Sequence, residues 1–401
     1  SSTTRKTEPV KYVNGYVGSS SVQNAVVQAV PVDVQGQTAT EIVTKDDGQE
    51  EVYVGAKATT TTLAYYQVKL GNDDIGRPVT LIISGKDDEA TVERCELVNG
   101  CYGGWNYRTT KAVPQEYELR SSVGNAQNNM RININWVTHL ASALAYTSYI
   151  DNSGDGTNPD VPRAGVYTAF TIERANLWLN ELFGLSDIVS LRPLAPSELY
   201  KDSGLASAIK QESIIYGAIV AAGQQLALEA GQDPVDWLAD VVDEFLHNQG
   251  QLYQRSSVSS TTSLYRIFSA ARTVLQENRT YISAQNYSVP SELTAAIAVL
   301  DQRLDALESK TDELTAVDIP ASQVKNWLDR INNARAFMAD LNERLVNYKG
   351  QDPNTCNNGE AQDDNSCVHS FIDPAYVTKT VDYYDALNSI YEGVAPQLAT
   401  G

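Results

Sequence analysis

The sequence predicts an α+β protein of two domains, in which an antiparallel, Ig-like β-sandwich is followed by an all-α helical bundle. Up to residue 132, apolar and polar residues alternate with a period of two, and Thr and Val are frequent. From residue 133 onward, apolar residues recur at helical spacing. A chain of 401 residues also exceeds what one hydrophobic core usually serves. We therefore expect a flexible segment at 1–9, the sandwich at 10–132 and the helical domain at 133–401.

Several short segments of the first part have the composition and alternation of strands. They are residues 12–17, 25–32, 41–44, 51–54, 60–70, 79–84 and 90–98. Turn-forming pairs separate them at Asp47-Gly48, Gly71-Asn72 and Gly85-Lys86. Short strands at this spacing are typical of an antiparallel sandwich.

The helices of the second part are marked by their starts and ends. An apolar face over 172–183 ends at Gly184, a residue type typical of helix C-termini. Asp233-Pro234 predicts the start of another helix, because Asp caps helices and Pro fits the first helical position. Over 291–348, apolar residues recur at steps of three and four on both sides of Ile319-Pro320. This pattern predicts a long αα-hairpin about 291–348.

Charge and hydropathy restrict the partners of the chain. The net charge of −20 repels phosphate backbones, so we expect no nucleic-acid partner. No apolar run approaches the ~18 residues that span a bilayer, so we expect no transmembrane segment. The chain starts with Ser1-Ser2-Thr3-Thr4, and no apolar signal core follows. Export would then imply a signal already removed, and the polar start also suits a lipid anchor upstream of residue 1.

The four cysteines form two locally spaced pairs. Cys95 and Cys101 form the first of these pairs, and Cys356 and Cys367 form the second. Asn99-Gly100 places a turn signal inside the first pair. We predict that each pair is a disulfide, which is typical of exported proteins. Zinc is disfavoured, because neither pair has the CxxC spacing of zinc ligands.

One polar loop has the pattern of a calcium site. Within 151–160, oxygen-bearing residues alternate and a Gly stands at the sixth position, as at the opening of an EF-hand loop. The twelfth position is Pro162, so the bidentate Glu is missing. The candidate calcium ligands are Asp151, Ser153, Asp155 and Asp160. An ordinary polar loop explains the same residues, and apart from calcium we expect no cofactor.

No motif in the sequence predicts a catalytic residue. The patterns HExxH, GxSxG and the phosphate-binding Gly loop are all missing. We interpret His139 and His247 as structural, since neither lies near a nucleophile or ligand motif. Carboxylate pairs such as Asp236 and Asp240 keep a hydrolase open as an alternative. Two aromatic clusters are either contact patches or core, one formed by Tyr102, Trp105 and Tyr107 and the other by Tyr383 and Tyr384.

Several stretches resemble known exported modules. Residues 13–17, 24–29 and 78–85 resemble the carboxypeptidase-regulatory-like, transthyretin-type Ig modules of bacterial exported proteins. Residues 136–141, 172–176 and 182–185 are similar to the helical region that follows such modules in some of these proteins. The middle departs from the pattern, because 59–66 stands where an Asp-rich turn and a Gly are usual. The resemblance implies a sandwich and an extracellular location. It does not assign an activity.

Together, these features predict an exported, non-enzymatic bacterial protein that is secreted or associated with the outer membrane or cell surface. It would bind a protein or surface partner, act in adhesion, or assemble with copies of itself into a filament or array. Two alternatives remain open. One is a polysaccharide or peptide hydrolase with an unrecognised carboxylate site, and the other is a solute-binding module.

Overall fold

A computed structural model describes residues 10–315 of the chain, with gaps, and Ala339. The gaps are 34–35, 39–40, 45–49, 54–55, 60–63, 87–89, 115, 149–161, 256–261 and 312. By backbone contacts, Ser1–Val317 forms one compact unit and Asp318–Gly401 another. The description below concerns the first unit.

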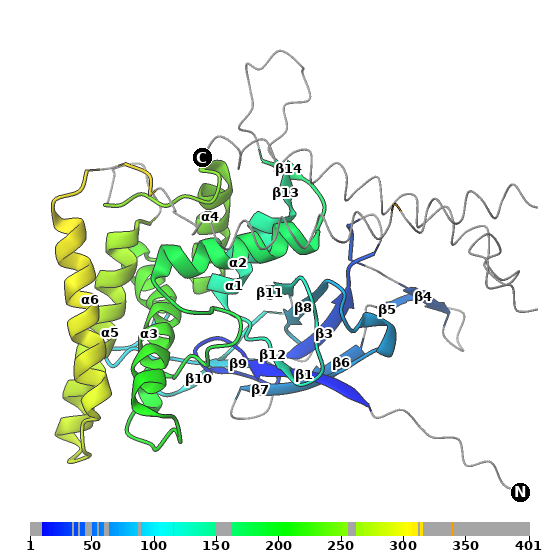
Figure 1. The fold of residues 1–401 in the computed structure, drawn as a ribbon. Coiled ribbons are helices and arrows are strands. Elements are labelled where there is room, and N and C mark those ends of the chain that lie inside the picture. Colours follow the sequence, from blue (N-terminus) through cyan, green and yellow to red (C-terminus); the bar gives the residue numbers. More distant parts are fainter. Residues whose placement is uncertain are drawn as a thin grey trace, which may run out of the picture. The chain divides into compact units, whose positions relative to one another are not determined.

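The predicted α+β class is confirmed, with small, mostly antiparallel sheets and α-helices (Figure 1). The longer strands are β1 (Lys11–Tyr16), β3 (Val26–Pro31), β7 (Tyr65–Leu70), β8 (Val79–Ser84) and β11 (Glu118–Val123). The shorter strands are β2 (Val22–Gln23), β4 (Glu41–Thr44), β5 (Glu50–Tyr53), β6 (Ala56–Thr59), β9 (Val92–Arg94), β10 (Thr110–Ala112), β12 (Met130–Arg131), β13 (Thr147–Ser148) and β14 (Arg163–Ala164). They pair in the orders β11-β8-β3-β6, β12-β1-β7, β10-β9-β2, β13-β14 and β4-β5.

Period-two alternation explains the two central pairings. In the four-stranded sheet, Val27 of β3 lies opposite Ile83 of β8, and both side chains are fully buried. In the three-stranded sheet, Val13 of β1 lies opposite Val68 of β7, and both are buried as well. Strand β12 joins the other edge of β1 in parallel.

The α-helices among the described residues are α1 (Trp136–Tyr146), α2 (Ala169–Phe183), α3 (Ser207–Ala230), α4 (Pro234–His247), α5 (Leu264–Ala284) and α6 (Ser291–Glu308). Three predicted ends are confirmed. Gly184 terminates α2 with a left-handed φ of 63°, a conformation that favours glycine. Asp233 caps α4 by accepting a hydrogen bond from the backbone N–H of Val235 at 2.9 Å. Helix α6 begins at Ser291, the start of the predicted hairpin.

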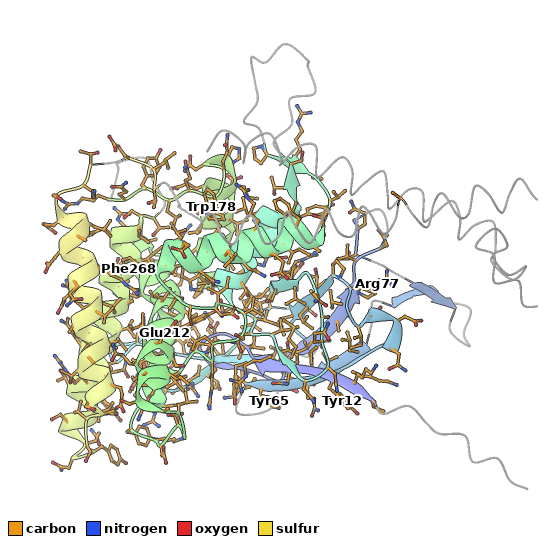
Figure 2. All side chains as sticks on the ribbon, viewed as in Figure 1. Tyr12, Tyr65, Arg77, Trp178, Glu212 and Phe268 are labelled. Carbon is orange, nitrogen blue, oxygen red and sulfur yellow. A yellow bond between two sulfur atoms is a disulfide. The ribbon has the colours of Figure 1, made fainter. Side chains whose placement is uncertain are left out.

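Strands and helices share one hydrophobic core. Helix α1 packs against both β11 and α2, while α3 packs against α5 and α6 (Figure 1). The side chains drawn in Figure 2 fill the space between these elements. One cluster of buried apolar residues extends from Val13 in β1 through Trp136 in α1 to Leu300 in α6. Because this core continues across residue 132, the predicted domain boundary there is not confirmed, and neither is an Ig-like sandwich.

The outer edge of β11 is covered by helix side chains. His139 Nδ1 accepts a hydrogen bond from the backbone N–H of Arg120 at 3.1 Å. Thr138 Oγ1 donates to the carbonyl of Arg120 at 2.9 Å, and Asn176 donates to the carbonyl of Ser122 at 2.9 Å. Burial lowers the pKa of His139 to about 4, so the ring is neutral at pH 7. These contacts satisfy an edge that would otherwise be open to another strand.

Some sequence expectations need correction or lie outside the described residues. Strand β11 was not among the predicted strands, and the β13–β14 pair lies in the part predicted to be helical. Apart from Ala339, the second half of the 291–348 hairpin lies outside the described residues. No helix within the described part of the chain is both long and apolar enough to cross a bilayer.

Candidate functional site

A cavity of about 420 Å³ opens where strands and helices meet, and we call it the β–α cavity. Its walls come from the turn after β1, from β2 and β9, from the segment between α2 and α3, and from the start of α3. The lining residues are Ser20, Gln23, Arg94, Arg192, Leu194, Ala195, Glu198, Leu199, Lys201, Asp202, Ser203 and Lys210.

The segment between α2 and α3 is held in place by backbone contacts. The N–H of Leu194 donates to the carbonyl of Ser213 in α3 at 3.0 Å. A Cβ at Gly217 would lie 1.7 Å from the Leu194 carbonyl oxygen, so only glycine allows this close approach. On the other side, Ser20 Oγ donates to the carbonyl of Pro193 at 2.8 Å. The cavity wall is thus fixed to both a helix and a strand turn.

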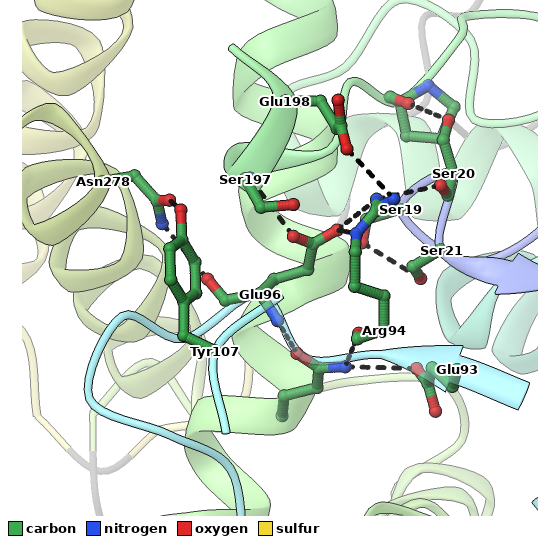
Figure 3. Close-up of polar contacts among 12 residues, drawn as sticks. Ser19, Ser20, Ser21, Glu93, Arg94, Glu96, Tyr107, Ser197, Glu198 and Asn278 are labelled. Carbon is green, nitrogen blue, oxygen red and sulfur yellow. Dashed lines mark hydrogen bonds and ion pairs between the residues drawn. The ribbon is translucent and has the colours of Figure 1, made fainter. Parts of the chain in front are cut away.

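A buried ion-pair network lies beside the cavity (Figure 3). Arg94 donates to Glu96 Oε1 from Nε at 3.3 Å and from Nη2 at 2.8 Å, and its Nη1 lies 3.4 Å from Glu198 Oε1. Nη2 also donates to the Ser20 carbonyl at 3.1 Å. Burial alone would lower the pKa of Arg94, but the two carboxylates outweigh burial and raise it. Arg94 is therefore a fixed cation.

Glu96 is fully buried and joins several elements. Its Oε2 accepts a hydrogen bond from the backbone N–H of Ser197 at 3.2 Å, in the short helix η2 (Pro196–Glu198). Its own N–H donates to Gln224 of α3 at 2.9 Å, and its carbonyl accepts from Asn278 of α5 at 3.1 Å. Tyr107 donates to the same Asn278 side chain at 2.6 Å (Figure 3). A buried carboxylate is tolerated here because both of its oxygens have partners.

The predicted disulfide between Cys95 and Cys101 is present, directly after β9. Both sulfurs are buried in a small apolar cluster with Leu97, Trp105, Ala221 and Val274. Gly100 has a φ of 94°, as the predicted turn requires. The bridge thus closes the loop that docks on α3 and α5.

The second predicted disulfide stays a prediction. Cys356 and Cys367 both lie outside the described residues, so the structure does not test whether they are bonded to each other. Within the described part of the chain, the bridge between Cys95 and Cys101 accounts for both cysteines and leaves no free thiol.

The cations of the cavity differ in how they are neutralised. Glu198 is shared by Arg94 and Lys201. Lys210 lies 4.0 Å from Glu292 of α6. Among the described residues, Arg192 has no carboxylate partner, and its guanidinium lies 4.3 Å from the centre of the Tyr16 ring. Its Nε is buried without a hydrogen-bond partner.

A second titratable position lies on the other side of β9. Burial raises the pKa of Glu93 to about 7. The hydrogen bond that Gln224 Nε2 donates to Glu93 at 3.3 Å lowers this pKa, but burial has the larger effect. Glu93 lines a small hollow together with Lys111 and Asp233, which form an ion pair at 3.4 Å. A carboxyl group of this pKa can exchange protons near neutral pH.

Several other sequence-predicted residues are not tested. Tyr383 and Tyr384 and the candidate calcium ligands Asp151, Ser153, Asp155 and Asp160 lie outside the described residues. No group of three or more His, Cys, Asp or Glu in the described part of the chain could hold a metal ion. In the first aromatic cluster, Trp105 is buried and Tyr102 is exposed.

Sequence reasoning missed Arg94, Glu96 and Arg192. The local signal was the position of Arg94 and Glu96 on either side of Cys95, a predicted disulfide residue. Comparisons with protein-family models, with curated proteins and with solved structures found no match to this chain. The geometry of the cavity therefore carries the proposal of a ligand site.

Proposed function

We propose that this chain is an exported bacterial cell-surface protein whose function is binding, with the β–α cavity as its ligand site. The observation that carries the proposal is the cavity itself. Its volume of about 420 Å³ falls in the range of small-molecule sites, roughly 300–1,000 Å³. Its lining combines apolar side chains such as Leu194 with charged ones such as Arg94 and Lys210, which suits a polar ligand.

Preorganisation of the wall supports binding. Arg94 is held by two carboxylates, and Glu96 ties the strand side of the cavity to three helical elements. A ligand would therefore meet side chains already in place, and little conformational entropy would be lost on binding.

Export is supported by the disulfide. The bridge Cys95–Cys101 is buried against α3 and α5, and such bridges persist in oxidising compartments. The net charge of −20 and the resemblance to exported modules agree with that compartment. In this proposal the ligand is part of a surface, a partner protein or a solute outside the cell.

A second candidate function is hydrolysis through Glu93. The observation that favours it is the pKa of about 7, which suits a general acid or base, beside Asp233. Replacing Glu93 by Gln should then abolish turnover of polysaccharide or peptide substrates and leave the fold intact. Equal turnover by the variant would rule this candidate out.

The binding proposal is tested by filling the cavity. Gln23→Trp places a large side chain in the β–α cavity, and Gln251→Trp does the same in a separate cavity of about 250 Å³ lined by Arg174 and Trp178. Melting temperatures of the three proteins are measured against a library of sugars, amino acids and organic acids. Ligands of the native protein should lose their effect on Gln23→Trp and keep it on Gln251→Trp.

Two outcomes would contradict the proposal. One is that ligands stabilise Gln23→Trp as much as the native protein. The other is that fractionation of the producing cells finds the protein in the cytoplasm with its cysteines reduced.

A further inference from the structure

Two arginines share one tyrosine ring at the edge of the β–α cavity. The guanidinium carbon of Arg192 lies 4.3 Å from the centre of the Tyr16 ring, and that of Arg131 lies 5.7 Å from it. Tyr16 ends β1, Arg131 belongs to β12 and Arg192 comes from the segment before η2. Two positive charges are thus brought to one place by three separate elements.

Each of the two arginines has one side-chain nitrogen without a hydrogen-bond partner. The Nε atoms of Arg131 and Arg192 are both buried and have no hydrogen-bond partner. Among the described residues, no carboxylate lies within ion-pair distance of either guanidinium. Buried donors without acceptors are rare in proteins and need an explanation.

Arg192 is the member of this pair that lines the cavity. The other cations of the cavity have acidic partners within the protein. Arg94 and Lys201 both pair with Glu198, and Lys210 lies 4.0 Å from Glu292. Asp202 at the same cavity is exposed, and its carboxylate accepts from the N–H of Gly204 at 2.9 Å. Among the described cavity residues, Arg192 is therefore the cation without a carboxylate partner.

We infer that Arg192 binds an oxyanion group of the ligand in the β–α cavity, and that the group is a carboxylate, sulfate or phosphate. Contact with the Tyr16 ring positions the guanidinium. A guanidinium group can hold two oxygens of such a group at once. Lys210 contributes positive charge from the wall of α3, and Arg131 adds to the local positive potential. This inference rests on the proposed binding function and names the chemistry of the ligand.

The test uses three simple probes, namely sodium acetate, sodium sulfate and inorganic phosphate. Each is titrated into the full-length protein by calorimetry at constant ionic strength, with sodium chloride as the balancing salt. We expect at least one probe to bind the native protein. Arg192→Gln should weaken that binding at least about tenfold, and Arg192→Lys should weaken it less, because charge remains but the fork of donors is lost.

Arg174→Gln is the matched control. Arg174 also stacks on an aromatic ring, at 5.4 Å from Trp178, and lines a different cavity. It should leave anion binding unchanged. Native-like circular dichroism of each variant separates lost binding from lost folding, and Arg192→Lys keeps the test informative if Arg192→Gln does not fold.

The inference is overturned if none of the three probes binds, or if Arg192→Gln and Arg174→Gln bind them as well as the native protein does. Failure of the inference is distinguishable from failure of the proposed function. Neutral ligands that are blocked by Gln23→Trp but not by Arg192→Gln would leave the binding function standing without the oxyanion. Anion binding at Arg192 in a protein found in the cytoplasm would leave the oxyanion site standing and would overturn the proposed cell-surface function.

Discussion

Replacing Glu93 by Gln should stabilise the protein relative to the native chain, and this gain should be larger at alkaline than at acidic pH. Burial raises the pKa of Glu93 from its ordinary value of 4.5 to about 7. Below pH 4.5 the group is neutral in both the folded and the unfolded chain, and it then carries no penalty. As the pH rises from 4.5 through 7, the unfolded chain releases this proton more readily than the folded protein with its half-buried carboxyl group, and stability is lost over that range.

The magnitude follows from the pKa. A tenfold difference in proton affinity corresponds to about 1.4 kcal/mol, so ionised Glu93 destabilises the fold by at most about 3 kcal/mol. Gln is a neutral side chain of the same shape and can still accept the hydrogen bond from Gln224. The difference in free energy of unfolding between variant and native protein should therefore grow by up to about 3 kcal/mol between about pH 4 and pH 8.

Urea denaturation followed by tryptophan fluorescence at about pH 4, 6 and 8 measures this difference. Glu116→Gln is the control. Glu116 is exposed, so its replacement removes no buried carboxyl group and should give a far smaller difference between variant and native protein. A difference for Glu93→Gln that is independent of pH, or that falls as the pH rises, would refute the reasoning.

Three further predictions concern the frame of the cavity. Gly217→Ala should lower the free energy of unfolding by roughly 3 kcal/mol or more, because its Cβ would collide with a backbone carbonyl; an unchanged urea midpoint would contradict the packing. Replacing Cys95 and Cys101 together by Ala should lower it by roughly 2–3 kcal/mol through loop-closure entropy, and equal stability would show that the bridge does not hold the loop. Arg94→Met should cost about 3–5 kcal/mol by leaving a buried carboxylate unpaired. Adding Glu96→Leu should restore most of that loss in a double-mutant cycle, and purely additive losses would contradict the pairing.

The elements that the sequence predicted well are those with local signals. Gly184 and Asp233 act on their own helix ends, so their effect can be seen without knowing the fold. Strand β11 was missed because its alternation is hidden by serines. Ser122 is buried and its hydroxyl is hydrogen-bonded to Thr80 at 2.9 Å and to Ser142 at 2.8 Å. A buried polar side chain gives no hydrophobic pattern, and its partners come from other elements.

The same reason explains why the candidate site was only partly predictable. The disulfide Cys95–Cys101 spans a short stretch of sequence, and its spacing predicted it. The pairing of Glu96 with Ser197, and of Arg192 with Tyr16, joins residues far apart in the chain. Nothing near Arg192 in the sequence indicates that its Nε is buried without a partner, because that follows from packing alone.

The most direct test of the binding site is a crystal structure of the full chain soaked with sodium selenate, an anomalous scatterer of the size and charge of sulfate. The account predicts an anomalous peak inside the β–α cavity, within hydrogen-bond distance of the Arg192 guanidinium and on the side of the ring of Tyr16 that Arg192 occupies. The same soak of Arg192→Gln crystals should lack this peak. An empty cavity in the native protein, with Arg192 donating to an oxygen of the protein instead, would contradict the account.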